Sequence, residues 1–309
     1  NLVAFSGPDF KATFDKQSGL LTSYLYKKHE YILNGQGPRP FFWRAPTDND
    51  YGANLPVRLK AWKEASYQEP KAESFQVTPG SNATTVKVTY RFPQTEARWN
   101  ITYKIYASGV IKVDNRFMAE GDQAPMIPRV GLRMQLPESF TDLTYYGRGP
   151  KENYRDRRTS QFIGEYAIPV KDMYEPYVRP QENNHRTDIY WCALTDKTQR
   201  GLLLIADRTF ELNASNYPLE SMDSGDTIDN GAPRTEKTHH RHLTDPLPEK
   251  MVDLFIDYRM MGVGGDDSWG ATAHEPYLIR PGKENAIEYG FSLVPFDKKE
   301  DYKYLIQQY

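Results

Sequence analysis

The chain has 309 residues and carries 39 Lys and Arg against 41 Asp and Glu, so its formal net charge is −2. A chain of this length can bury the core of one large domain or of two ordinary ones. The balanced charge offers no basic surface of the kind that nucleic-acid binding needs. The longest aliphatic run, at about residues 201–206, is far too short to span a membrane.

The first polar loop is FWRAPTDNDYG, at residues 42–52. Asp48 and Asp50 have the spacing that opens an EF-hand loop. However, Gly52 and Leu59 stand where that loop needs an oxygen ligand and a glutamate. We therefore expect a turn rather than a calcium site, with Gly52 free to adopt a positive φ.

Helical patterns are scarce. Residues 57–65 fit two helical turns with Leu59 and Trp62 on one side, and the tail at 299–309 is a second, weaker candidate.

Alternation of apolar and polar residues is the dominant pattern and predicts strands. Each predicted strand has one face in a core and the other face against solvent or a second layer. Ser108 and Gly109 separate the first of these strands from another apolar stretch, which predicts a hairpin. The clearest alternating stretches are residues 99–105, 130–136, 252–258 and 287–293.

The fold class follows from these elements together. Many strands, few helices and turns supplied by 21 Gly and 22 Pro predict an all-β fold, a large antiparallel sandwich. Neither an internal repeat nor a Pro- or Ser-rich linker divides the sequence, so we expect one domain.

Thiol and imidazole chemistry has little support. Cys192 is the single cysteine and lies in an apolar stretch, where a buried and inert thiol is expected. His240 and His242 would share a face of a strand and could both bind a metal. Since zinc sites need three or four protein ligands and the sequence indicates no others, hydrogen-bonded structural roles are favoured.

Residues 145–157 are dense in turn formers and charges, and their Arg and acidic residues could form a packed ion-pair network. As a phosphate site this stretch lacks a following helix. The sequence also contains no G-x-S-x-G motif, so a serine hydrolase triad has no support.

The most unusual loop is MMGVGGDDSWG, at residues 260–270. It is not a dinucleotide-binding loop, because Asp267 stands at the third glycine position and no helical pattern follows. Asp266 and Asp267 are adjacent, so in extended chain they point to opposite faces and would not converge as a glycosidase pair. We expect them to set the loop by accepting hydrogen bonds from backbone N–H groups, with catalysis as the lesser alternative.

Several of these stretches together resemble the C-terminal small-chain domain of the bacterial β-galactosidases of glycoside hydrolase family 2. They occur in the order found in that domain, and the resemblance covers about residues 10–296. We therefore expect a small-chain domain at residues 1–296 and a C-terminal extension at 297–309. The stretches that carry the resemblance are residues 44–50, 147–157, 172–178, 180–183, 240–243 and 262–269.

The resemblance implies a super-sandwich of antiparallel sheets related to the galactose mutarotase fold. In the family this domain follows a jelly roll, two immunoglobulin-like domains and a TIM barrel. The barrel carries both catalytic glutamates and the magnesium and sodium sites. The resemblance thus implies that this chain has no catalytic residue, metal or cofactor of its own, and that it is inactive in isolation.

The partners that the resemblance implies are a β-galactoside substrate such as lactose and the other domains of the same enzyme. The parent enzyme would be a homo-oligomer. It would be a soluble bacterial protein, cytoplasmic or periplasmic.

One side chain of this domain contacts substrate in the family, a tryptophan that stacks on the sugar at the mouth of the barrel. Trp269 is the matching residue here. An indole offers a large, rigid apolar face at low conformational cost, although from the residue alone a buried core Trp is the simpler interpretation. Asp50 and Gly52 border the active site more weakly by the same resemblance. The loop that supports Trp269 consists of Gly264, Gly265, Asp266, Asp267 and Ser268.

Two other functions stay open. A free-standing sugar mutarotase or epimerase of the same fold would need a general acid and a general base, for which His185 and Glu182 are the nearest candidates. A carbohydrate-binding module would instead use surface aromatic residues.

Overall fold

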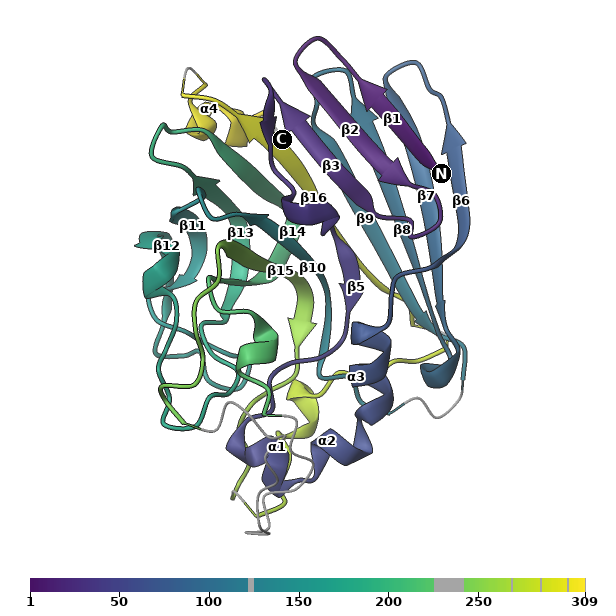
Figure 1. Cartoon of the computed structure of the whole chain (residues 1–309). Coiled ribbons are helices and arrows are strands. Elements are labelled where there is room, and N and C mark those ends of the chain that lie inside the picture. Colours follow the sequence, from purple (N-terminus) through teal and green to yellow (C-terminus); the bar gives the residue numbers. More distant parts are fainter. Residues whose placement is uncertain (122–124, 225–241, 268, 284, 299, 309) are drawn as a thin grey trace.

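The computed structural model describes residues 1–121, 125–224, 242–267, 269–283, 285–298 and 300–308 (Figure 1). The described strands form two antiparallel sheets, which confirms the all-β prediction. None of the helices in these ranges is long and apolar enough to cross a membrane.

The smaller sheet has four strands in the order β1-β2-β3-β4. They are β1 (Leu2–Ser6), β2 (Phe10–Asp15), β3 (Leu21–Tyr26) and β4 (His29–Glu30). The larger sheet has 12 strands, and nine of them follow one path from β12 to β6. They are β5 (Arg39–Phe41), β6 (Ala72–Thr78), β7 (Ala83–Phe92), β8 (Ala97–Tyr106), β9 (Ile111–Ala119), β10 (Arg129–Pro137), β11 (Asp142–Gly149), β12 (Phe162–Pro169), β13 (Arg186–Thr195), β14 (Gly201–Ser215), β15 (Met251–Met260) and β16 (Ile287–Phe296).

Short helices occupy the connections between strands. The α-helices are α1 (Asp48–Gly52), α2 (Leu55–Arg58), α3 (Lys60–Tyr67) and α4 (Tyr302–Ile306). The 3₁₀ turns are η1 (Leu33–Gly35), η2 (Pro93–Thr95), η3 (Val170–Asp172), η4 (Leu219–Ser221) and η5 (Glu275–Tyr277).

The strand β8 shows why the alternating stretches fold as they do. Its residues alternate strictly between buried and half-buried positions along its whole length. The predicted hairpin between β8 and β9 is confirmed, because Gly109 turns the chain with φ of 93° and its N–H donates to the Tyr106 carbonyl at 2.9 Å. Alternating residues therefore place one face of this meander in the core.

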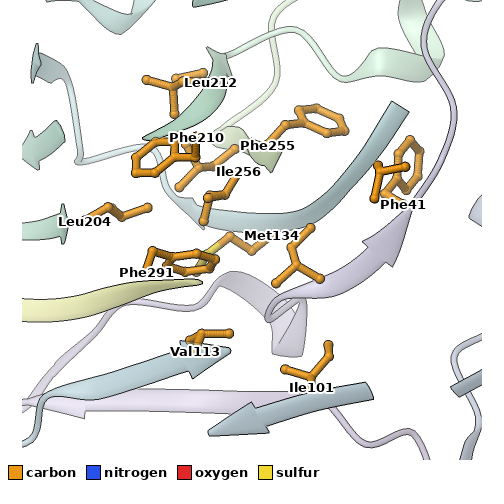
Figure 2. Close-up of a cluster of buried hydrophobic side chains, with 14 of the residues drawn as sticks. Phe41, Ile101, Val113, Met134, Leu204, Phe210, Leu212, Phe255, Ile256 and Phe291 are labelled. Carbon is orange, nitrogen blue, oxygen red and sulfur yellow. The ribbon is translucent and has the colours of Figure 1, made fainter. Parts of the chain in front are cut away.

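The long strand β14 divides the large sheet into two layers. Its first half, from Gly201 to Ala206, pairs with β16, whereas Glu211 to Ser215 pair with β15. Side chains of the second half of β14 and of β15, β10 and β5 then face those of β16, β9 and β8 across the core (Figure 2). The small sheet packs on the end of the large sheet that contains β8 (Figure 1). There the ring centroids of Phe14 in β2 and Tyr103 in β8 are 5.1 Å apart.

The strands β10 and β15 are buried on both faces, so their polar residues face a second layer and not solvent. Burial of charge requires partners, and the partners are present across the strand pair. Arg133 of β10 is held by Asp253 of β15 at 2.8 Å. It is also held by Glu220 at 2.6 Å. On the face of β10 and β15 that carries Arg133, buried ion pairs therefore take the place of apolar packing.

The predicted helix at residues 57–65 is divided. The chain turns at Leu59, which has φ of −112° and ψ of 17° and stands between α2 and α3. Leu59 and Trp62 are nevertheless both buried, as the pattern predicted. In the tail, α4 is a short helix whose Tyr302 packs against Trp191 on the outer face of the sheet.

Cys192 is buried in β13, as predicted, and burial raises the pKa of its thiol, which disfavours the reactive thiolate.

Replacing Gly131 by Ala should lower the free energy of unfolding by about 2 kcal/mol, as overpacked cores do. A Cβ at Gly131 would lie 1.7 Å from Oδ1 of Asp257 and 2.9 Å from its Cα. Gly282→Ala is the matched control, because a Cβ there meets nothing nearer than 3.9 Å. Urea denaturation followed by fluorescence measures the free energy of unfolding of both variants. Equal midpoints for the two variants would contradict the prediction.

Candidate functional site

The loop that ends in Trp269 leaves the sheet where β15 ends, and a buried arginine holds its root. Arg44 donates from Nη1 to the Met261 carbonyl at 2.7 Å and from Nη2 to the Gly262 carbonyl at 3.0 Å. The same guanidinium contacts both carboxylate oxygens of Asp50, at 2.7 and 2.9 Å. Arg44 is only 2% exposed, so these contacts are made away from water. The root of the loop is therefore tied to α1.

A second carboxylate, that of Asp156, binds the backbone of the next residues of the loop. It accepts hydrogen bonds from the backbone N–H of Val263 at 3.1 Å and of Gly264 at 2.7 Å. A Cβ at Gly262 would lie 2.5 Å from this carboxylate. Gly262 is thus required for close approach to Asp156 and not for an unusual φ, since its φ is not positive.

At the tip of the loop, Asp267 acts as the internal anchor that the sequence predicted. Its Oδ1 accepts from the backbone N–H of Trp269 at 2.8 Å, of Gly270 at 3.2 Å and of Ala271 at 3.3 Å. These hydrogen bonds favour the charged form and lower the pKa of Asp267. The neighbouring Asp266 instead contacts Nε2 of His274 at 2.8 Å. Both acids therefore hold the loop.

Trp269 is 89% exposed, more than any other large hydrophobic residue that the structure describes. The interpretation as a buried core tryptophan is therefore wrong. Its indole has no core to pack against, while its backbone is fixed through Asp267. Ser268 lies outside the described residues. The arrangement presents a flat apolar ring from an anchored turn.

Asp50 and Gly52 both lie in α1, beside this loop. Asp50 completes a capping box with Thr47 at the helix start, which is why the loop at residues 42–52 folds into a helical turn. Gly52 is the last residue of α1 and has no positive φ, so that prediction is wrong. A Cβ on Gly270 would have the Gly52 carbonyl oxygen as its nearest neighbour, at 3.9 Å. The structure thus brings Gly52 next to the tip of the loop.

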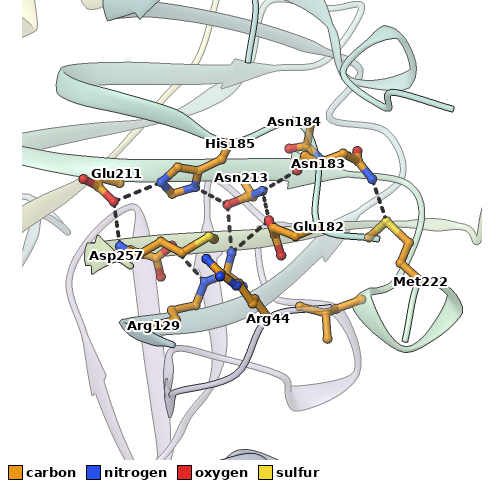
Figure 3. Close-up of polar contacts among 12 residues, drawn as sticks. Arg44, Arg129, Glu182, Asn183, Asn184, His185, Glu211, Asn213, Met222 and Asp257 are labelled. Carbon is orange, nitrogen blue, oxygen red and sulfur yellow. Dashed lines mark hydrogen bonds and ion pairs between the residues drawn. The ribbon is translucent and has the colours of Figure 1, made fainter. Parts of the chain in front are cut away.

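His185 and Glu182, the acid–base candidates of the epimerase hypothesis, are buried in a polar network (Figure 3). His185 contacts Oδ1 of Asn213 through Nδ1 at 2.6 Å and Oε2 of Glu211 through Nε2 at 3.0 Å. Glu182 accepts from Nδ2 of Asn213 at 2.9 Å and from Arg129 at 3.3 Å. Both ring nitrogens of His185 are therefore already engaged, and no substrate can reach them.

The network dictates the protonation state of His185. The amide group of Asn213 donates to Glu182 and to the Asn183 carbonyl, so its Oδ1 faces His185 as an acceptor. Because Glu211 is also an acceptor, both ring nitrogens must donate. Burial by itself would lower the pKa of His185, but the hydrogen bond and charge of Glu211 outweigh it and raise the pKa.

Asp257 is fully buried in the same network. It faces Nε of Arg129 at 3.1 Å, but its carboxylate oxygens accept no hydrogen bond from the part of the chain that the structure describes. Burial raises the pKa of Asp257 to about 7, against the opposing charge of Arg129. These charges join β10, β14 and β15 to the segment just before β13, and their role is structural.

Metal ligands do not gather within the described ranges, where no group of three or more His, Cys, Asp and Glu side chains could hold a metal ion. His240, one of the two candidate imidazoles, lies outside those ranges. His242 is exposed, and its backbone N–H donates to Asp245 at 2.9 Å.

The sequence did not indicate that Arg44 and Asp156 position the loop, nor that Arg129 lies in the buried network. Asp156 belongs to the charged stretch that was expected to form ion pairs, and part of that expectation is confirmed. Within residues 145–157, Arg157 pairs with Glu152 at 2.5 Å, while Arg148 pairs with Asp188 outside the stretch at 2.7 Å. Charged residues within apolar or turn-rich stretches do indicate that an ion pair is buried there. They do not indicate which residue is the partner.

A protein-family model matches most of the chain. The family model described as "Beta galactosidase small chain" matches residues 6–293. The β-galactosidase of Priestia megaterium is 34% identical over 277 residues, which are 90% of this chain and 25% of that protein. The β-galactosidase of Halalkalibacterium halodurans is 30% identical and is matched over 94% of this chain and 27% of its own length. The chain thus spans about a quarter of these curated relatives.

Solved structures of similar fold include sugar epimerases. A galactose 1-epimerase from Lactobacillus acidophilus aligns with a TM-score of 0.52 at 7% identity, over 96% of this chain and 98% of that one. A GalM/aldose epimerase homologue from C. elegans aligns with a TM-score of 0.50 at 9% identity, over 96% of this chain and 99% of that one. These likenesses confirm the predicted fold, and at such identities they show the fold alone.

We predict that at pH 6.5, the ordinary pKa of a histidine, the folded His185 ring is mainly doubly protonated, visible in ¹⁵N NMR as two protonated ring nitrogens. The unfolded pKa is about 6.5, and the folded pKa is higher. The stabilisation is thus complete below pH 6.5 and is lost as pH rises through the folded pKa. The free energy of unfolding should therefore fall as pH rises above 6.5. Asp257 acts in the same direction between roughly pH 4 and pH 7.

His242 is exposed, so its ring signals show in the same spectra how a histidine in contact with water appears. His185→Gln should lower the free energy of unfolding at pH 6 by about 3 kcal/mol, because it leaves Glu211 buried without a cationic partner. A mainly neutral His185 ring at pH 6.5 in the folded protein would contradict this account of the network.

Proposed function

Since the chain belongs to the β-galactosidase small chain family, we propose that it is the C-terminal domain of a retaining family 2 β-galactosidase. The whole enzyme hydrolyses terminal β-D-galactosides such as lactose. In this proposal a TIM barrel elsewhere in the enzyme carries the two catalytic glutamates and the magnesium and sodium sites. This chain contributes a substrate-stacking tryptophan and structural support.

The observation that carries the proposal is the 89% exposure of Trp269 on an anchored loop. An exposed indole gains free energy when a partner covers its apolar surface. The C–H face of a galactoside is such a partner, because an aromatic ring can cover it without competing for the hydroxyl groups. Because Asp267 already fixes the backbone of Trp269, that part of the loop loses little freedom when a sugar binds.

The contribution of this chain to the reaction is to position the sugar. Arg44 and Asp156 fix the root of the loop, Asp267 fixes its tip, and Trp269 places a flat wall at the entry subsite. Such a wall holds the glycosidic bond between two carboxyl groups that belong to the barrel, as the double displacement of retaining glycosidases requires. Bond making and bond breaking are performed by groups outside this chain.

An independent epimerase is the weaker alternative, despite the shared fold. A general acid and base must reach the anomeric hydroxyl and ring oxygen of the sugar. His185 is fully buried and both of its nitrogens are occupied by Asn213 and Glu211. This chain therefore has the fold of the epimerases, but the imidazole of His185 is not available to a substrate.

Trp269→Ala in the full-length enzyme should raise KM for a β-galactoside about tenfold, equivalent to about 1.4 kcal/mol of lost stacking. Thermal stability should stay within about 1 °C, because an exposed side chain adds little to folding. Steady-state kinetics and calorimetry measure the two quantities. Phe162→Ala removes a ring that is 74% exposed on the edge strand β12 and is the matched control. If Trp269→Ala changed KM no more than Phe162→Ala does, the stacking role would be refuted.

The isolated chain should hydrolyse no aryl β-galactoside and should not speed the interconversion of galactose anomers. Chromogenic release and polarimetry test the two reactions on the same preparation. Hydrolysis by the chain alone would show that it contains its own catalytic groups. Accelerated anomer interconversion would favour the epimerase alternative.

A further inference from the structure

A polar cleft of about 320 Å³ opens at the foot of the Trp269 loop, beside the start of α1. Its volume lies in the range of small-ligand sites. All but one of the stretches that carry the family resemblance reach it: residues 44–50, 147–157, 172–178, 180–183 and 262–269. Among the lining residues are Asp48, Tyr154, Arg157, Tyr177, Gln181 and Glu182.

Two buried groups in the cleft wall have unused hydrogen-bonding capacity. Glu182 is 4% exposed, and its Oε1 accepts from Arg129 and Asn213. No hydrogen bond joins its Oε2 to any residue that the structure describes. Tyr154 is 2% exposed, and its hydroxyl has no partner within the described chain. An unpaired buried hydroxyl costs about 1–3 kcal/mol, so a ligand that supplies a partner gains that interaction.

The charges around the cleft are already compensated. Arg157 pairs with Glu152 at 2.5 Å, and Glu182 pairs with Arg129 at 3.3 Å. Asp48 lies 3.7 Å from Arg179. A strongly charged ligand would have to compete with these pairs, whereas a neutral ligand leaves them intact. The cleft therefore favours a neutral, hydrogen-bonding ligand.

The remaining groups match a hydroxyl-rich ring. Gln181 offers an amide at the rim, where its Nε2 lies 3.3 Å from Oδ2 of Asp48. The Tyr154 ring is fixed between His185, with ring centroids 5.4 Å apart, and the guanidinium of Arg157 at 5.1 Å. Amide, carboxylate and tyrosine groups of this kind are the polar groups that fix the orientation of a small ligand in its pocket.

We propose that this cleft is a second saccharide subsite, which binds one neutral pyranose unit through Glu182, Tyr154 and Gln181. The inference goes beyond the proposed stacking by Trp269 and does not rest on it. One wall of the subsite is shared with the loop, since Nδ2 of Asn49 donates to the Val263 carbonyl at 2.9 Å. A sugar bound there packs against the root of the loop that carries Trp269.

The test is an NMR titration of the 309-residue chain with methyl β-D-galactopyranoside, following the side-chain amide signals of Asn49 and Gln181. We expect saturable shifts with a millimolar Kd. Tyr154→Phe removes only the hydroxyl and should weaken binding about fivefold, the value of one hydrogen bond. Gln181→Ala, at the half-buried rim, should weaken it similarly and serves if Tyr154→Phe perturbs the fold.

Tyr103→Phe is the matched control, because Tyr103 also has a buried hydroxyl without a described partner but does not line the cleft. It should leave the Kd unchanged. Trp269→Ala should likewise leave the Asn49 and Gln181 shifts intact, so a failure of the stacking role is distinguishable from a failure of this subsite. Absence of saturable shifts, or an unchanged Kd in both cleft variants, overturns the proposal. Saturation by inorganic phosphate instead of the sugar would also overturn it.

Discussion

Buried guanidinium groups are the constraint on which this end of the molecule depends. Arg44 and Arg129 are 2% and 0% exposed, so neither can be solvated by water. An unpaired charge in such a position is costly, and removal of one partner from a buried pair typically costs 3–5 kcal/mol. The chain meets this requirement by bringing acceptors from distant segments. Asp50 and two loop carbonyls surround Arg44, while Glu182, Asn213 and the Trp43 carbonyl surround Arg129.

This requirement explains how an exposed tryptophan can stand on an ordered loop. Loops that run over the surface have few packing contacts to fix them. Here the root of the loop takes its position from Arg44 and Asp156, and the tip takes its position from Asp267. Glycines permit the backbone to approach Asp156 closely, as a Cβ at Gly262 would not. The loop is thus ordered by polar contacts below it, and the indole of Trp269 is left free to face outward.

The sequence predicted the strands well because alternation records which side of a strand is buried. It predicted β8 and its hairpin closely, and it indicated the unusual character of the Trp269 loop. It could not predict the two-faced burial of β10 and β15, because Arg133 and Asp253 look like surface residues until their pairing is known. Nor could it find the root of the loop, since Arg44 and Met261 are 217 positions apart in the chain. Periodicity is local, whereas the partners of buried charges are set by topology.

The same constraint separates fold from function in this molecule. The epimerase neighbours share the sandwich over nearly the whole chain at identities of 7% and 9%, which carries no information about side-chain chemistry. In this chain a histidine and a glutamate do lie close together, but each is occupied by scaffold contacts, His185 through both nitrogens and Glu182 through Oε1. Polar groups used to pair buried charges cannot at the same time exchange protons with a substrate. What this end of the sandwich has left for function is therefore at its surface, on the Trp269 loop and in the cleft at its foot.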